Sequence, residues 1–230
     1  MNDLHHTNFG ATFDFVSTRH RVLRNTYWLL ALSMIPTVLG AWLGVQFNFS
    51  LLAGNPMLGF VLFLGIAFGF FYAIEKTKNS GLGVALLLGF TFFMGLMLSR
   101  LIEHILGFSN GTALIMTAFG GTGAILAVMA TVATVSKRDF SGMGKWLMMG
   151  LIVIIVASIA NIWLQMPAMQ LAISTIAVGI FSAYILHDVQ RIINGGETNY
   201  VMATLGIYLS VYNIFANLLA ILGILGGQRD

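Results

Sequence analysis

Seven apolar stretches of 18 to 25 residues follow one another along this 230-residue chain. They cover residues 26–45, 56–74, 81–98, 112–135, 146–164, 168–186 and 201–225. All 19 formally charged side chains lie outside these stretches. A helix needs ~20 mostly apolar residues to cross the ~30 Å hydrocarbon core of a bilayer. The pattern therefore predicts an all-α integral membrane protein built as one bundle of seven transmembrane helices.

The composition excludes the main alternatives to such a bundle. Hydrophobic residues make up 58% of the chain and charged residues 8%, whereas soluble domains carry ~25% charged residues. The net charge of +3 is too small for a surface that binds nucleic acid. The apolar stretches also lack the alternation of polar and apolar residues that is typical of membrane β-barrels. A soluble domain, a disordered chain, a nucleic-acid binder and a barrel are thus excluded.

The basic residues predict the orientation of the helices. Only Arg100 and Arg229 fall on the side opposite the amino terminus. Nine lie in the amino-terminal segment and in the connections on its side: Arg19, Arg21, Arg24, Lys76, Lys78, Lys137, Arg138, Lys145 and Arg191. The positive-inside rule then predicts a cytoplasmic amino terminus and a carboxyl terminus outside the cytoplasm. The expected organisation is a polar tail (1–25), a helical domain (26–226) and a short outer tail (227–230).

Several kinds of chemistry lack the residues that they need. The chain has no cysteine, no H-E-x-x-H pair and no lysine in 201–225 that could bind retinal. The segment 120–126, GGTGAIL, resembles a dinucleotide-binding loop, but Leu126 stands where that loop needs its last glycine. His5 and His6 either bind a metal or belong to a solvated tail. No enzymatic activity, cofactor or resident metal is expected.

One group of polar residues lies at the cytoplasmic end of the sixth predicted helix. It consists of His187, Asp188 and Arg191. An ionisable group at a membrane boundary is a candidate for function, because its charge depends on its access to water. Asp188 is therefore a candidate pore residue or pH sensor, and His187 and Arg191 beside it are further candidates. The alternative is structural: Asp188 and Arg191 are three residues apart on a helix and can pair with each other.

A second group forms a polar stripe on the seventh predicted helix. Ser210, Asn213 and Asn217 share one helical face, with Tyr208 and Tyr212 nearby. In hydrocarbon such a face turns inward, where it either bonds to other helices or lines a pathway. If this helix is central, the stripe and Asp188 share one polar pocket.

A third group, together with three glycine pairs, is best explained by structure. Arg100, Glu103 and His104 follow the third predicted helix, where Arg100 bonds Glu103 or reaches the headgroups. Three G-x-x-x-G pairs allow close approach of helices, either between copies of the chain or, as we favour, inside the bundle. These pairs are Gly40/Gly44, Gly65/Gly69 and Gly223/Gly227.

Two segments of the chain resemble a known family. HDVQRIINGGETNY (187–200), which leads into LGIYLSVYNIFANLLAILG (205–223), resembles the signature of the Bax inhibitor family of seven-helix membrane proteins. HRVLRNTYWLLALS (20–33) and NIWLQMPAMQLAIS (161–174) are similar to its bacterial YccA-like branch. The resemblance covers nearly the whole chain and implies the Bax inhibitor fold in a bacterial inner membrane, with the carboxyl terminus in the periplasm.

The resemblance implies two alternative functions. YccA-like proteins are associated with the membrane AAA+ protease FtsH, as substrate and modulator, so FtsH and its membrane regulators are the expected partners. Other branches are pH-sensitive calcium leak pathways that use two aspartates on helices six and seven. The first aspartate matches Asp188, but Ser210 stands at the second position. Because two close carboxylates share a proton and a serine cannot replace one of them, the resemblance favours protease modulation over a calcium or cation leak.

A physical picture accompanies the protease hypothesis. An AAA+ protease must grip a flexible end before it pulls, and residues 1–25 are expected to be a disordered tail that offers such an end. A tightly packed bundle would then resist extraction and occupy the protease.

Overall fold

The structure is a computed structural model that describes residues 6–49 and 56–228, with side chains described for 19–49 and 57–228. Seven long α-helices make up most of the described chain, and each predicted apolar stretch lies within one of them. They are α1 (His6–Gln46), α2 (Pro56–Thr77), α3 (Gly81–Leu106), α4 (Gly111–Val135), α5 (Gly144–Leu164), α6 (Pro167–Ile193) and α7 (Tyr200–Gly226). A short 3₁₀ helix, η1 (Ser141–Met143), precedes α5. All seven are long and apolar enough to cross a membrane, which confirms the predicted fold class.

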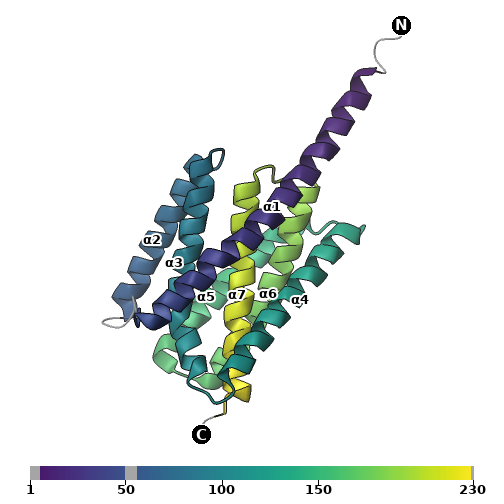
Figure 1. Cartoon of the computed structure of the whole chain (residues 1–230). Helices are drawn as coiled ribbons and strands as arrows, with labels where there is room; N and C mark the ends of the chain where they lie inside the picture. Colours follow the sequence, from purple (N-terminus) through teal and green to yellow (C-terminus); the bar gives the residue numbers. More distant parts are fainter. Residues whose placement is uncertain (1–5, 50–55, 229–230) are drawn as a thin grey trace.

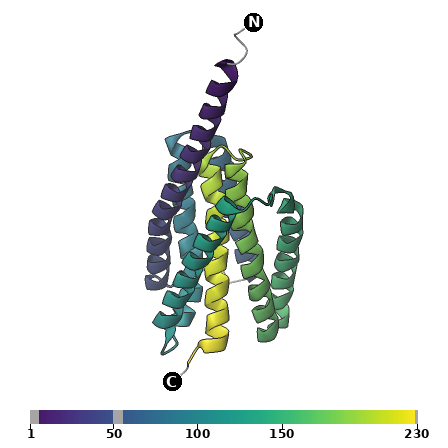
Figure 2. The same cartoon turned by 90° about the vertical axis from the view of Figure 1, so that its right-hand side faces the viewer.

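Helix α7 occupies the centre of the bundle. It packs against α1, α2, α3, α4 and α6, and the two views in Figure 1 and Figure 2 both place it between the outer helices. Its side chains Ile207, Ile214 and Leu219 are completely buried. The central position means that polar residues on α7 face other helices rather than lipid.

Helices α1 and α3 cross with their backbones in contact. A Cβ added to Gly40 of α1 would overlap the carbonyl oxygen of Phe92, and one added to Gly95 of α3 would overlap that of Thr37. Glycine is required at both positions because no side chain fits between the two backbones. The crossing holds the carboxyl-terminal half of α1 against α3.

Helices α3 and α6 extend well beyond the predicted stretches. Helix α3 continues to Leu106, so Arg100, Glu103 and His104 lie inside it rather than after it. Helix α6 likewise continues past Leu186 to Ile193. Charged residues end an apolar stretch but not a helix, because their backbone groups still bond along the helix. Glycines lie just beyond both ends: Gly107 follows α3 directly, and Gly195 after α6 has a positive φ of 78°.

The clearest difference between the sequence-based prediction and the structure concerns the amino-terminal tail. Helix α1 begins at His6, so residues 6–25 are helical and the prediction of disorder is wrong for them. Figure 1 shows this part of α1 projecting past the ends of the other helices. The apolar span of α1 is Arg19–Gln46, and the domain boundary at residue 25 stays a prediction. His5 lies outside the described residues, as does the side chain of His6.

The connections sort to two ends of the bundle. Those between α2 and α3, α4 and α5, and α6 and α7 lie at the end from which α1 projects (Figure 1). Of the nine basic residues counted above, Lys78, Lys137 and Arg138 lie in these connections and the other six lie in the adjoining helices. The α3–α4 connection lies at the other end, with the carboxyl-terminal end of α7. The end that faces the cytoplasm stays a prediction from these charges.

Candidate functional site

A pocket of about 620 Å³ lies between α2, α3, α5, α6 and α7. Asp188 of α6 lines it together with Ser210, Tyr212 and Asn213 of α7. Phenylalanine and methionine side chains from α2, α3 and α5 form most of its apolar wall. The structure thus brings Asp188 and part of the α7 stripe into one pocket, as expected for a central seventh helix. The role of these residues as pore or pH sensor stays a prediction.

The carboxylate of Asp188 faces the bundle interior. Its side chain is 20% exposed, and its Oδ1 lies 3.0 Å from Nδ1 of His187. On the α7 side, Oδ2 lies 3.1 Å from the place where a Cβ on Gly206 would be. Gly206 therefore makes room for the carboxylate. Sequence reasoning missed this glycine, although it stands one turn before Ser210.

The structural alternative for Asp188 is wrong. Arg191 does not pair with Asp188; its Nη2 lies 3.5 Å from Oε2 of Glu197, near the start of α7. Among the described side chains, His187 bonds to Asp188, and Tyr184 in the same pocket interacts with it electrostatically. This leaves the carboxylate beside an imidazole rather than a permanent cation.

The polar stripe of α7 is satisfied within its own helix. Ser210 donates to the carbonyl of Gly206 at 3.2 Å, and Asn213 donates to that of Leu209 at 2.8 Å. Asn217 donates to the carbonyl of Asn213 at 2.8 Å and does not line the pocket. These bonds do not join α7 to other helices, so interhelical bonding is not the role of the three side chains.

Tyr208 instead makes the interhelical connection. Its hydroxyl lies 2.9 Å from Oγ1 of Thr37 on α1 and donates to the carbonyl of Thr91 on α3 at 3.3 Å. Its ring is 1% exposed. Tyr208 therefore ties α1, α3 and α7 together next to the pocket without lining it.

Sequence reasoning also missed two hydrogen bonds that join α6 to the α4–α5 connection. The buried amide of Gln190 donates to the carbonyl of Arg138 at 2.8 Å and accepts from the backbone N–H of Phe140 at 2.7 Å. These bonds hold the α4–α5 connection against α6. Gly144, where α5 begins, lies against the ring of His187. The partners are about 50 residues apart, and no local pattern signals them.

The connection held by Gln190 carries one carboxyl with a shifted pKa. The backbone N–H of Ser141 donates to Oδ1 of Asp139 at 2.8 Å. This hydrogen bond favours the charged form and lowers the pKa of the Asp139 carboxyl. Asp139 is fully exposed and does not line the pocket.

The third polar group makes local contacts. Arg100 and Glu103 form an exposed pair at 3.5 Å, and the ring of His104 packs edge-on against Phe108. None of the three lines the Asp188 pocket. No group of three potential metal ligands occurs among the residues described.

The glycine pairs differ in role. A Cβ on Gly44 would meet Ser99, and one on Gly223 would meet Ile105. With Gly40, these positions confirm packing inside the bundle. Gly65 and Gly69 of α2 would meet no atom within 4 Å, so bundle packing is the wrong explanation for that pair.

The fold and the pocket define a class: a seven-helix integral membrane protein with a half-buried carboxylate between helices α6 and α7. Residues 19–228 match the family described as Inhibitor of apoptosis-promoting Bax1. The chain belongs to this Bax inhibitor family, as its signature segments indicated.

Two relatives cover nearly the same length. The chain is 37% identical over 204 residues to the Modulator of FtsH protease YccA of Escherichia coli K12. The aligned region covers 89% of this chain and 90% of that protein. It is 35% identical over 227 residues to an uncharacterized protein of Neisseria meningitidis serogroup A. This aligned region covers 98% of this chain and all of that protein.

Proposed function

We propose that this protein is a multi-pass inner-membrane modulator of an FtsH-type AAA+ protease. It acts as a substrate that the protease grips but extracts poorly. The observation that carries the proposal is the 37% identity, over 89% of the chain, to a protein named Modulator of FtsH protease YccA. A second relative, also 37% identical, is named Inner membrane protein YccA. This name supports a location in the inner membrane.

The amino-terminal part of α1 supports the gripping step. It projects past the other helices at the end that carries the basic connections (Figure 2). With that end in the cytoplasm, the extension reaches toward the ATPase ring of a membrane protease. A single helix that lacks tertiary packing is marginal in water, so an ATPase can unwind it at little cost.

The packing of α1 supports the stalling step. A pull on the amino terminus is transmitted along α1 to its crossing with α3, where the backbones touch at Gly40 and Gly95. The hydroxyl contact between Thr37 and Tyr208 must break as well. Because these contacts share one segment, they must yield together before α1 leaves the bundle.

The test is degradation of a membrane substrate by reconstituted FtsH, with and without this protein in the same bilayer. We expect slower degradation of that substrate while this chain persists. Deletion of residues 2–20 should abolish the inhibition, because it removes the projecting part of α1. Unchanged inhibition by the shortened chain contradicts gripping through the amino terminus, and no inhibition by excess full chain contradicts the proposal itself.

A second candidate function is a pH-sensitive calcium or other cation leak. The observation that favours it is the pocket shared by Asp188, Ser210 and Asn213. If this candidate is right, Asp188→Asn abolishes the pH response of cation flux into vesicles, because the carboxylate is lost. Ser210→Asp should strengthen that response by restoring a carboxylate pair. A leak is contradicted if the unmodified protein shows no flux, or if the unmodified protein and the two variants show the same flux at every pH. Inhibition of the protease should not depend on either residue.

A further inference from the structure

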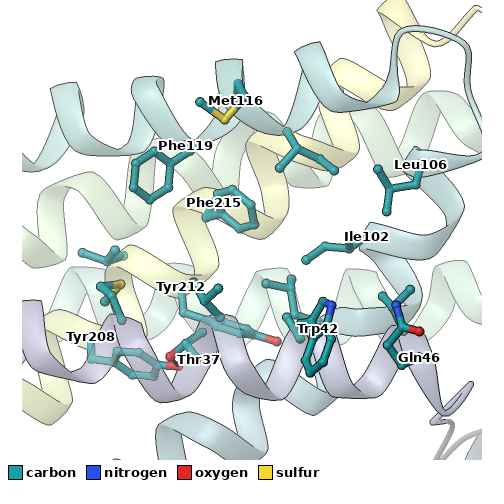
Figure 3. A pocket seen from close by; sticks show the side chains of 17 residues that line it. Thr37, Trp42, Gln46, Ile102, Leu106, Met116, Phe119, Tyr208, Tyr212 and Phe215 are labelled. Carbon is teal, nitrogen blue, oxygen red and sulfur yellow. Dashed lines mark hydrogen bonds between the residues drawn. The ribbon is translucent and has the colours of Figure 1, made fainter.

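A second pocket, of about 570 Å³, lies on the other side of α7. Helices α1, α3, α4 and α7 form its walls, and Figure 3 shows their side chains meeting around one groove. Apart from Thr37, Gln46 and the hydroxyls of two tyrosines, every side chain that lines it is apolar. The proposed function makes no use of this groove.

The groove opens sideways, toward the surroundings of the bundle. Val38 on the α1 wall is 63% exposed, and Met116 and Phe119 on the α4 wall are 64% and 61% exposed. All three lie within helices that are apolar enough to span a membrane. Their exposed surface therefore meets lipid rather than water.

The depth of the groove matches one leaflet. It runs along α1 from Gln46, at the end of that helix, to Met34. Twelve residues at ~1.5 Å each correspond to roughly 18 Å, a little more than half of the ~30 Å hydrocarbon core. Trp42 lines the part of the groove near the end of α1 and is 58% exposed, as is typical of an aromatic side chain near a membrane interface.

The inner end of the groove offers little to a polar ligand. Met34 lies there, and one turn away Thr37 and the hydroxyl of Tyr208 lie 2.9 Å apart and bond to each other (Figure 3). Thr37 also donates to the carbonyl of Ser33 at 2.8 Å. With these groups already paired, an apolar chain end loses nothing by lying against them.

We propose that this groove binds one acyl chain of a membrane phospholipid. The lipid belongs to the leaflet at the carboxyl end of α1, which is the outer leaflet in the predicted orientation. An empty groove would leave its walls without van der Waals partners, and a flexible chain can follow an irregular wall. A transmembrane helix of a partner fits less well, because it would cross both leaflets whereas the groove ends near the midplane.

The bound chain would also border the Asp188 pocket. Tyr212 lines both pockets, with one on each side of α7. Its ring lies tilted against that of Tyr208, with centroids 6.2 Å apart. The acyl chain and the carboxylate pocket are thus separated by the side chains of a single helix.

The test uses the full chain in vesicles of phosphatidylethanolamine and phosphatidylglycerol. A trace of phosphatidylethanolamine carries a diazirine at the end of one acyl chain, and cross-links are mapped by mass spectrometry after illumination. We expect labelling concentrated on the groove segments of α1, α4 and α7. Val38→Trp should lower it about tenfold, which corresponds to ~1.4 kcal/mol in binding, because the indole fills the groove.

The matched control is Val153→Trp on α5. Val153 is 65% exposed and lines neither pocket, so this variant should leave labelling of the groove unchanged. Met116→Trp fills the groove from the opposite wall and should repeat the effect of Val38→Trp, which guards against a folding defect of one variant. Labelling that is equal on α5 and in the groove, or that survives both groove variants, would mean ordinary boundary lipid and overturn the proposal. Cross-links between protein chains through the groove would overturn it in favour of a partner helix.

Discussion

At the scale of single residues, the polar side chains of the bundle divide into two kinds. Ser210 and Asn213 bond to their own helix and leave the surface of the pocket polar. Tyr208 bonds to two other helices and is buried. Both kinds lie on one helix within a few residues, so residue type and helical face alone do not separate the residues that line the Asp188 pocket from those that bond to other helices.

We expect Tyr208→Phe to destabilise the bundle by about 1 kcal/mol, because the hydroxyl bonds to Thr37 and Thr91 are lost while the ring stays. Thermal unfolding in detergent measures this as a lower Tm. Tyr72→Phe on α2 is the control, since Tyr72 is 68% exposed and its loss of a hydroxyl should leave Tm unchanged. Equal Tm values for both variants would mean that the Tyr208 hydroxyl bonds contribute nothing.

At the scale of helices, the crossing of α1 and α3 is the closest approach in the bundle that glycines create. Gly40 and Gly95 face each other's helix, and each meets a backbone carbonyl. The α4–α5 connection is held differently, through the single side chain of Gln190. Close backbone contact therefore holds α1 against α3, whereas hydrogen bonds hold the carboxyl-terminal end of α6 against the α4–α5 connection.

Gly95→Val should separate α1 from α3, because its side chain would overlap the backbone of Thr37. We expect a loss of stability on the order of 3 kcal/mol. If tight packing is what makes the chain hard to extract, FtsH should also degrade this variant faster. The half-life of the chain in reconstituted vesicles is the measurement.

Gly65→Val is the control for that experiment, because an added Cβ at Gly65 meets no atom within 4 Å. Its half-life should match that of the unmodified chain. Should the two valine variants be degraded at the same rate, the α1–α3 crossing does not limit extraction.

At the scale of the whole molecule, the connections at the two ends differ in charge. The end with the α2–α3 and α4–α5 connections carries Lys76, Lys78, Lys137 and Arg138. This asymmetry predicts that it faces the cytoplasm. The absence of cysteine from the sequence makes the prediction easy to test.

Two single-cysteine variants provide that test. Ser80 in the α2–α3 connection and Ser109 in the α3–α4 connection are both exposed and lie at opposite ends. In intact spheroplasts, an impermeant maleimide should label Ser109→Cys but not Ser80→Cys, and lysis should make both reactive. The reverse pattern would invert the topology and remove the α1 extension from the reach of a cytoplasmic ATPase.

The sequence by itself determined the number of crossings, the fold class and the family. Crossing length and charge placement are local properties, because each helix must satisfy its own backbone in lipid. Local patterns also explain two of the wrong predictions. Charged residues end the apolar stretches, but α3 and α6 continue past them. The polar start of α1 has the composition of a disordered tail, but it is helical.

Only the tertiary structure decided which side chains meet. In water, an apolar stripe marks the face of a helix that packs. Helices that are apolar all round carry no such mark, so their contacts depend on shape and on a few polar bonds. The sequence placed Asp188 and Ser210 near each other through consecutive helices. The contacts of Thr37 with Tyr208 and of Gln190 with the α4–α5 connection join distant positions, and only the packed bundle brings them together.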